Sequence, residues 1–210
     1  MTSLLILGAG GHSKVVAETA LATGLYSKLF FLDDKFKNKN FIDRSNKLLI
    51  GSLDDSVERL LGQFNNAVVA LGDNHLRIKW INKLLEFNYN LPVIIHPKSY
   101  ISPSAVINSG TVVFANSVIQ SDVVIGLGGI INSSSNIEHD SSLGKGVHIS
   151  PGVNISGEVE IKDLSWIGIG SSVINNIKIG KNVILGAGSV LIDDLPDGVK
   201  AAGVPAKILN

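Results

Sequence analysis

The chain of 210 residues contains no cysteine, so disulfides, thiolate metal sites and a cysteine nucleophile are all excluded. An excess of charge of one sign is also missing, because Lys plus Arg and Asp plus Glu number 18 each and form no basic stripe. Without such a stripe we expect no nucleic-acid partner. The apolar runs are interrupted by Gly, Asn or Ser well before the ~20 residues of a membrane span, so we expect no membrane insertion. The N-terminus enters a strand-like segment without a charged leader, which predicts a cytoplasmic protein.

What the sequence does contain is a strict period of six residues in its second half. Every sixth position is a branched aliphatic: Ile101, Ile107, Val113, Ile119, Ile125, Ile131, Ile137, Leu143, Ile149, Ile155, Ile161, Ile167, Val173, Ile179, Leu185 and Leu191. The position two residues before each aliphatic, from Ala105 to Ser189, is small or β-branched. A period of six fits neither a helix nor a plain strand, but it fits a coil that turns a corner every six residues. The sequence therefore predicts a parallel β-helix with about five coils of eighteen residues.

The first part of the chain has a different pattern, in which strands alternate with helices. Strands are expected at 3–7, 28–32, 67–71 and 90–95, and helices at 14–25 and about 75–88. This alternation predicts a small parallel sheet whose loops gather at the carboxyl edge. Pro97 and Pro103 mark the passage into the repeat. We therefore expect two domains, residues 1–97 and residues 98–210.

Short motifs outside the period of six complete the pattern. They are the loop Gly8-Ala9-Gly10-Gly11-His12-Ser13, the pair Asp33-Asp34, the join Ile94-Ile95-His96-Pro97 and the closing Gly203-Val204-Pro205-Ala206-Lys207. Over nearly its whole length the chain resembles the bacterial nucleotide-sugar acetyltransferases of the left-handed β-helix family. That family includes the bacillosamine-pathway and perosamine N-acetyltransferases and relatives named as sialic acid O-acetyltransferases.

The resemblance implies a fold, a co-substrate and an assembly. The fold would be an α/β, Rossmann-like N-terminal domain that binds a nucleotide sugar, followed by a left-handed parallel β-helix of hexapeptide repeats. The β-helix would bind acetyl-CoA and carry out catalysis without a metal. The family builds a homotrimer with active sites at the subunit interfaces, and we expect the same assembly here.

The family's catalytic stretch matches residues 132–140 of this sequence. In the family, the histidine at the position of His139 is the proposed general base, and the acid after it orients the ring. A carboxylate on one ring nitrogen fixes the tautomer and raises the basicity of the other nitrogen, as proton abstraction requires. Family members of the bacillosamine type carry Glu where this chain has Asp140. Either the shorter Asp140 reaches His139, or Glu138 takes its place.

The resemblance also assigns three residues to the acetyl donor. His148 matches a histidine near the acetyl thioester, Gly157 matches a glycine whose N–H faces the thioester oxygen, and Lys207 is expected near the CoA phosphates. A backbone N–H in that place stabilises the oxyanion that forms when an amine attacks. His139 and His148 are half a coil apart, so in one chain they lie on different faces. They share a site only if neighbouring subunits contribute one each, or else one of them is not catalytic.

The N-terminal glycine loop is an incomplete dinucleotide motif, because Ser13 stands where the last glycine of G-x-G-x-x-G belongs. Glycines still let a pyrophosphate approach the backbone, and acids after the second strand bind hydroxyls or a base edge. By resemblance, the residues expected to bind the nucleotide sugar are Gly10, Gly11, His12, Asp33, Asp34, Gly72, Asn74 and Arg77.

These observations predict an acetyl-CoA-dependent N-acetyltransferase that acts on the amino group of a nucleotide-linked amino sugar. The resemblance favours a UDP-4-amino-4,6-dideoxy sugar. Two alternatives use the same acetyl donor and the same catalytic residues, namely O-acetylation of a sialic acid-type sugar and N-acetylation of a GDP-perosamine-type sugar. An alternative of another class is a non-catalytic scaffold that binds a nucleotide sugar. The departure at Asp140 supports the scaffold, and any turnover of acetyl-CoA excludes it.

Overall fold

A computed structural model describes residues 2–34, 41–42 and 48–209 of the chain. The chain divides into two compact units, Met1–Ile95 and His96–Asn210. Within the described residues no helix is long and apolar enough to cross a membrane.

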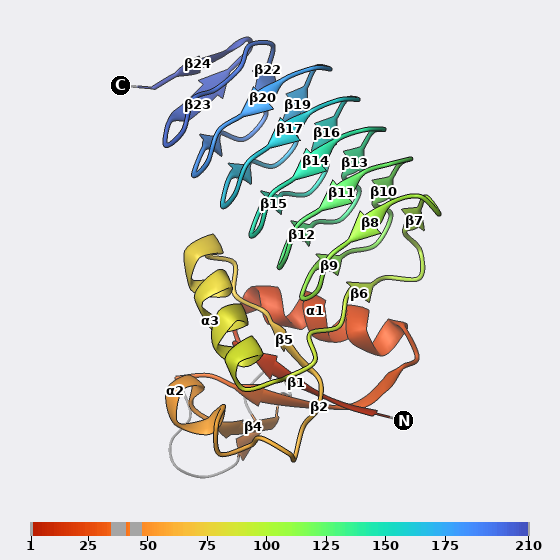
Figure 1. The fold of residues 1–210 in the computed structure, drawn as a ribbon, viewed down its shortest axis with the longest axis vertical. Coiled ribbons are helices and arrows are strands. Elements are labelled where there is room, and N and C mark those ends of the chain that lie inside the picture. The colour runs from red at the N-terminus through yellow and green to blue at the C-terminus, as the bar shows by residue number, and fades with distance from the viewer. Residues whose placement is uncertain (1, 35–40, 43–47, 210) are drawn as a thin grey trace. The chain divides into compact units, whose positions relative to one another are not determined.

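The first unit is built on a five-stranded sheet with the strand order β3-β4-β2-β1-β5 (Figure 1). Its elements are β1 (Thr2–Leu7), α1 (Gly11–Ala22), β2 (Tyr26–Leu32), β3 (Phe41–Ile42), β4 (Leu48–Gly51), α2 (Leu53–Ser56), β5 (Ala67–Val69), α3 (Asn74–Glu86) and β6 (Ile94–Ile95). β1 pairs in parallel with β2 on one side and with β5 on the other, and only the β3–β4 pair is antiparallel. The carboxyl ends of β1, β2 and β5 therefore lie at one edge, where their loops gather.

Local sequence explains where the two long helices begin. Helix α1 begins at Gly11 rather than at Lys14, because Gly10 occupies the N-cap in an extended conformation. Helix α3 begins at Asn74, where the carboxylate of Asp73 accepts a hydrogen bond of 2.7 Å from the N–H of Leu76. The strand expected over 90–95 is shorter, Ile94–Ile95. The short elements β3, β4 and α2 were not expected, because segments of two to four residues carry no measurable hydrophobic period.

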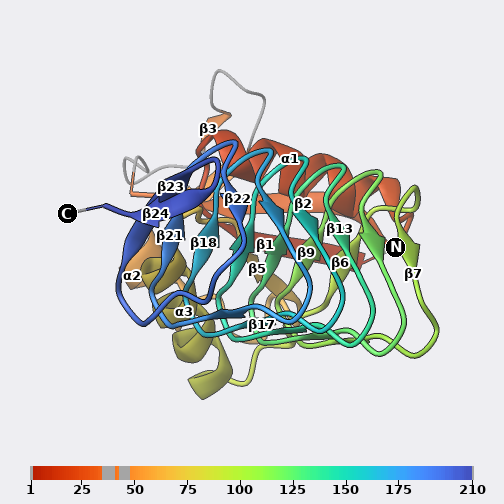
Figure 2. The same ribbon diagram turned by 90° about the horizontal axis from the view of Figure 1, so that it is seen from above.

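The second unit is a left-handed β-helix of mostly two-residue strands in three sheets, which are parallel except for the last strand (Figures 1 and 2). The first sheet contains β7 (Tyr100–Ile101), β10 (Val118–Ile119), β13 (Asn136–Ile137), β16 (Asn154–Ile155), β19 (Ser172–Val173) and β22 (Val190–Leu191). The second contains β8 (Val106–Ile107), β11 (Val124–Ile125), β14 (Ser142–Leu143), β17 (Glu160–Ile161) and β20 (Lys178–Ile179). The third contains β9 (Val112–Val113), β12 (Ile130–Ile131), β15 (His148–Ile149), β18 (Trp166–Ile167), β21 (Ile184–Leu185), β23 (Lys200–Gly203) and β24 (Ala206–Ile208).

The register between coils confirms the interpretation of the period of six. Each strand pairs with the strand eighteen residues later, as Ile119 does with Ile137 and Ile137 with Ile155. The periodic aliphatics from Val113 to Leu191 point inward and are at most 3% exposed. After the last coil, β23 continues the third sheet in parallel and β24 turns back antiparallel to it.

The corners of the β-helix share one backbone conformation. Every sixth residue from Gly110 to Gly188 has a φ between 54° and 69°. This is the left-handed region, which Gly, Asn and Asp enter most readily. Asp140 is one of these corner residues, with a φ of 58°. The period of six therefore fixes the backbone at the expected catalytic pair.

Candidate active site

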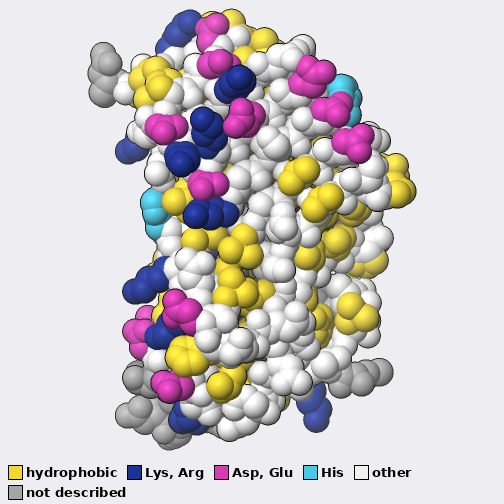
Figure 3. All heavy atoms as spheres, in the orientation of Figure 1, with side chains coloured by type: hydrophobic (Ala, Val, Ile, Leu, Met, Phe, Trp, Pro, Cys, Tyr) yellow, Lys and Arg dark blue, Asp and Glu magenta, His cyan; other side chains and the backbone are white. Residues whose placement is uncertain are grey.

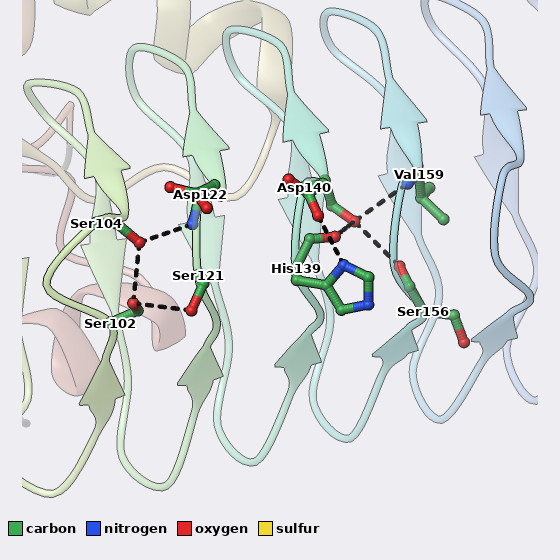
Figure 4. Close-up of polar contacts among 9 residues, drawn as sticks. Ser102, Ser104, Ser121, Asp122, His139, Asp140, Ser156 and Val159 are labelled. Carbon is green, nitrogen blue, oxygen red and sulfur yellow. Dashed lines mark hydrogen bonds and ion pairs between the residues drawn. The ribbon is translucent and has the colours of Figure 1, made fainter.

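His139 and Asp140 lie on the corner that follows β13, with both side chains more than half exposed (58% and 56%). The left-handed conformation of Asp140 turns its carboxylate back toward the preceding residue. The distance between His139 Nδ1 and Asp140 Oδ2 is 2.8 Å (Figure 4). Asp140 with its shorter side chain therefore reaches the imidazole, and none of the hydrogen bonds or ion pairs in the described part of the chain joins Glu138 to the ring.

This contact determines the protonation chemistry of His139. The hydrogen bond to Asp140 is the largest influence and raises the pKa of His139 above its ordinary value; desolvation lowers it, and the charges of Asp140, Glu158 and Glu138 each raise it further. An ionised Asp140 accepts a hydrogen bond from Nδ1–H, which holds the ring proton on Nδ1 and leaves the lone pair of Nε2 free to take a proton. The pair therefore has the chemistry of a general base at an exposed corner.

Gly157 lies directly against the imidazole. The pairing of Ile137 with Ile155 places residue 157 beside His139 on the next coil. A Cβ on Gly157 would lie 2.6 Å from Cε1 and 2.7 Å from Nε2 of His139. Any side chain at this position would therefore displace the ring. That the N–H of Gly157 holds the thioester oxygen stays a prediction.

His148 lies on another side of the β-helix, in β15 of the third sheet. Its ring stacks on Trp166, with 5.6 Å between the ring centres and 11° between the planes, and Trp166 Nε1 donates to Ser150 Oγ at 2.8 Å. These side chains line a groove of about 430 Å³, together with Asn132, Ile169 and Ile184. A groove with mostly apolar walls and a few polar groups suits a thioester and its flexible chain.

Sequence reasoning missed Trp166, although a signal for it exists. Residue 166 follows His148 by eighteen positions, so the register places the two side chains side by side on adjacent strands. An aromatic residue one coil beyond a candidate histidine therefore belongs in the same site. Asn132 was part of the matched stretch but had been given no role.

In the first unit, the glycine loop is held by Asp33. The carboxylate of Asp33 accepts a hydrogen bond of 2.6 Å from the N–H of Ala9. Gly8 is the glycine of the loop that the geometry requires, with a φ of 103° and with Leu71 and Ala70 within 3.0 Å of where a Cβ would lie. By contrast, a Cβ on Gly10 or Gly11 meets nothing within 4 Å. Gly10, Gly11 and the neighbouring turn residue Asp34 are exposed or half-exposed at the carboxyl edge of the sheet.

The structure brings three more of the predicted residues, Gly72, Asn74 and His12, together around Arg77, which is 1% exposed. The guanidinium donates to the carbonyl oxygens of Leu71 and Gly72 at 3.1 and 3.2 Å, and to Asn74 Oδ1 at 2.8 Å. Burial lowers the pKa of Arg77 to about 10, with the charge of Asp73 opposing, so Arg77 stays charged at neutral pH. Burial and the nearby Arg77 lower the pKa of His12 to about 4, so His12 is neutral. Arg77 thus fixes the loop after β5.

The remaining predicted residue, Lys207, is exposed in β24 and lies 3.8 Å from Asp193. Its contact with CoA phosphates stays a prediction. Among the residues that the structure describes, no three His, Asp or Glu side chains come close enough together to hold a metal ion.

Two family models match the chain. The first, the PglD N-terminal domain, covers residues 3–84, and the second, the bacterial transferase hexapeptide (six repeats), covers residues 158–193. A curated relative, the UDP-N-acetylbacillosamine N-acetyltransferase of Bacillus subtilis (strain 168), is 36% identical over 119 residues. The matched segment is 55% of this chain and spans only about half the length of that relative (52%).

Two solved structures are similar over almost their full length. The acetyltransferase domain of PglB from Neisseria gonorrhoeae FA1090, in complex with acetyl coenzyme A, is 39% identical with a TM-score of 0.92; the match covers 99% of this chain and 98% of that one. PerB from Caulobacter crescentus, in complex with CoA and GDP-perosamine, is 34% identical with a TM-score of 0.93; the match covers 100% and 98%.

Proposed function

Because the chain belongs to the nucleotide-sugar N-acetyltransferases of the left-handed β-helix family, we propose that it transfers acetyl from acetyl-CoA to the amino group of a nucleotide-linked amino sugar. The observation that carries the proposal is the His139–Asp140 pair at an exposed corner, where an amine can reach Nε2. His139 takes a proton from the amine as its nitrogen attacks the thioester carbon. The C–S bond then breaks, and the CoA thiolate leaves and takes up a proton.

The acetyl donor occupies the groove of the third sheet. The stacked rings of His148 and Trp166 form one wall of the groove, and the exposed Lys207 supplies positive charge for the CoA phosphates. The N–H of Gly157 faces the thioester oxygen. The two solved relatives hold acetyl coenzyme A and CoA, which supports acetyl-CoA as the donor.

The nucleotide sugar binds to the first unit, at the edge where the loops after β1, β2 and β5 gather. Gly10 and Gly11 let the pyrophosphate approach the start of α1, and Asp34 binds the sugar or base of the nucleoside. Asp33, Gly72, Asn74 and Arg77 fix the shape of the two loops, and neutral His12 offers a hydrogen bond without charge.

The sugar we propose is a UDP-4-amino-4,6-dideoxy sugar, in keeping with the curated relative's name. A GDP-linked sugar is the second candidate, because PerB was solved with GDP-perosamine. The residues described above would serve an amine or a hydroxyl acceptor equally. O-acetylation therefore stays an alternative that the choice of acceptor in an assay decides. A cytoplasmic location also stays a prediction.

We further propose a homotrimer in which each site takes His139 from one protomer and His148 from its neighbour. The two histidines belong to different sheets of one β-helix, after β13 and in β15. The coils also expose apolar side chains, among them Trp166, Ile169, Ile174 and Ile192, and Figure 3 shows apolar groups interspersed with charged ones on one face. Burying such side chains between protomers is favourable.

The test is a screen of UDP-, GDP- and dTDP-linked 4-amino sugars for CoA release from acetyl-CoA. We expect turnover with one of these classes, and His139→Ala should lower it by about 10² to 10⁴, the usual contribution of a general base. Ser121→Ala, which changes the matching corner one coil earlier, is the control and should keep near wild-type activity. Activity of His139→Ala within about threefold of wild type would contradict the role of His139. The absence of CoA release with every acceptor would favour the scaffold.

A further inference from the structure

The corners that follow the first sheet carry a column of three acids. Asp122, Asp140 and Glu158 are separated by one coil each, and all three have the left-handed conformation, with φ of 58°, 58° and 59°. The backbone ties each acid to the preceding corner, since the N–H of Asp140 donates to Ser121 O at 3.0 Å and that of Glu158 donates to His139 O at 2.9 Å. Neighbouring coils of a β-helix are ~4.8 Å apart, so His139 lies within two coil spacings of three carboxylates.

His139 does not lie evenly within this column. Its ring projects from its own coil toward the next coil, which carries Ser156 and Val159, and away from Ser121 and Asp122 (Figure 4). The contact with Gly157 shows the same lean, because a Cβ there would lie 2.6–3.1 Å from three ring atoms. Glu158, the residue after Gly157, is therefore the acid of the column toward which the imidazole leans after Asp140.

We propose that Glu158 is a positioning residue for His139, whose carboxylate supports the protonated imidazole from the coil beyond Asp140. The inference rests on the proposed role of His139 as the base. When His139 takes a proton from the amine, the ring becomes a cation, and Asp140 meets that charge only at Nδ1. The carboxylate of Glu158 stabilises the same cation from the side of Gly157.

Glu158 acts on the charge of His139 and is not engaged in any of the ion pairs of the described β-helix. The charged groups that act on the pKa of the imidazole are Asp140, Glu158 and Glu138, all acids that raise it; Asp122 is not among them. Besides the His139–Asp140 pair, the ion pairs of the described β-helix join Lys145 to Asp163 and Lys207 to Asp193, and none of the three involves Glu158. Glu158 itself is exposed. Its effect is therefore expected to be modest and reduced by salt.

The experiment measures the titration of His139 by NMR in the full-length protein, with the resonance assigned from its loss in His139→Gln. We expect Glu158→Gln to lower the pKa of His139, and Glu158→Asp, which keeps the charge, to restore it. Asp122→Asn is the matched control, because it removes one negative charge from the same column and the same backbone conformation. It should leave the titration nearly as in wild type. If Glu158→Gln does not fold, Glu158→Asn serves instead, because Asn suits a corner residue.

Equal titration of His139 in Glu158→Gln and wild type would overturn the inference. So would a decrease in Asp122→Asn as large as that in Glu158→Gln, because the effect would then be one of overall charge. This titration needs no substrate, so its result stands even if no nucleotide sugar is acetylated.

Kinetics give the second readout. The acid limb of kcat/KM against pH should move to lower pH in Glu158→Gln, and the plateau should fall about two- to threefold because a less basic imidazole abstracts protons more slowly. Added 0.5 M NaCl should move the wild-type limb in the same direction and change Glu158→Gln less, since salt screens exposed charges. A loss of activity without any movement of the limb would indicate a structural role for Glu158 and contradict the proposal.

Discussion

At the scale of residues, the candidate base depends on two neighbours that are not chemically active. Asp140 reaches Nδ1 because its backbone is left-handed, and Gly157 leaves room for the ring because it has no side chain. The first condition comes from the corner of the same coil and the second from the next coil. His139 is therefore oriented by backbone geometry as much as by its hydrogen bond.

Gly157→Ala should lower kcat by about 10- to 100-fold, because the new methyl group pushes the imidazole out of its position beside Asp140. The backbone itself tolerates alanine, since Gly157 does not have the positive φ of the neighbouring corner residues. Steady-state kinetics measure the loss, and binding of CoA, followed by calorimetry, should be nearly unchanged. In a His139→Ala background the same substitution should cost little more. A full further loss there would place the effect elsewhere.

His12 should make the protein sensitive to acid in a defined window. Its folded pKa of about 4 lies below the ordinary 6.5, so between these values the unfolded chain binds more protons than the folded one. The contribution of His12 to the free energy of unfolding is therefore fully present above pH 6.5. It falls by about 2–3 kcal/mol as the pH decreases toward 4. Thermal unfolding of wild type and His12→Asn across pH 4–7 measures this contribution. The variant should lose less stability on acidification, and parallel curves would contradict the assignment.

At the scale of elements, buried hydroxyls join the coils at their corners. Ser165 is 0% exposed; its Oγ donates to the carbonyl of Gly180 at 2.6 Å and accepts from the N–H of Val183 at 3.0 Å. Ser141 forms the matching pair of bonds with Ser156 and Val159. One hydroxyl thus forms hydrogen bonds with a backbone carbonyl and a backbone N–H of the following coil. Buried backbone groups need such partners because no water reaches them.

Ser165→Ala should destabilise the protein by about 2–3 kcal/mol, because it leaves both the Gly180 carbonyl and the Val183 N–H without their buried partner. Urea unfolding measures the change. Ser142→Ala, at an exposed position of β14, is the control and should stay within about 0.5 kcal/mol of wild type. Equal effects of the two substitutions would show that the buried hydroxyl contributes nothing.

Much of this architecture could be predicted from the sequence, because in a β-helix the side-chain period is also the structural repeat. The aliphatics at every sixth position determine the core, and Ile137 and Ile155 come into register as expected. The partner of His139 could not be decided in this way. Glu138 and Asp140 are equally close to His139 in sequence, and only the backbone conformation of the corner selects Asp140.

In the first unit, sequence patterns located the loops but not the function of each residue in them. That Arg77 binds the nucleotide stays a prediction, but the sequence did not indicate that its donors meet the carbonyls of Leu71 and Gly72. The direction of a backbone carbonyl has no signature in the sequence. Asp33 likewise holds the N–H of Ala9, a contact across the ends of two strands that only their parallel pairing creates.

At the scale of the whole molecule, the β-helix separates the proposed base from the groove that we assign to the acetyl donor. His139 follows a strand of the first sheet, and His148 lies in the third. A prism with three sides presents these groups in different directions. In the proposed homotrimer, three such prisms around one axis would bring the two groups together at each cleft between protomers.

Mixing two inactive variants tests this arrangement. If each site combines His139 of one protomer with His148 of the next, trimers reassembled from equal amounts of His139→Ala and His148→Ala contain intact sites. With random assortment about a quarter of the sites are intact, so about a quarter of the wild-type activity should return. CoA release after exchange of subunits measures it. An inactive mixture of fully exchanged trimers, or an active monomer in sedimentation, would refute the shared site.

The uniform corner of the β-helix also limits how the length of this chain can change. Adding or deleting one residue within residues 110–188 would move every later side chain out of phase, so that inward aliphatics would face solvent. A duplication of a whole coil, by contrast, keeps the phase. A repeat of residues 163–180 inserted after Gly180 would leave His139, Asp140 and Gly157 on their own coils and would add one strand to each of the three sheets beyond them, including a second copy of Trp166. Unequal recombination in units of one coil is thus a route by which such an enzyme can change its groove and keep its base.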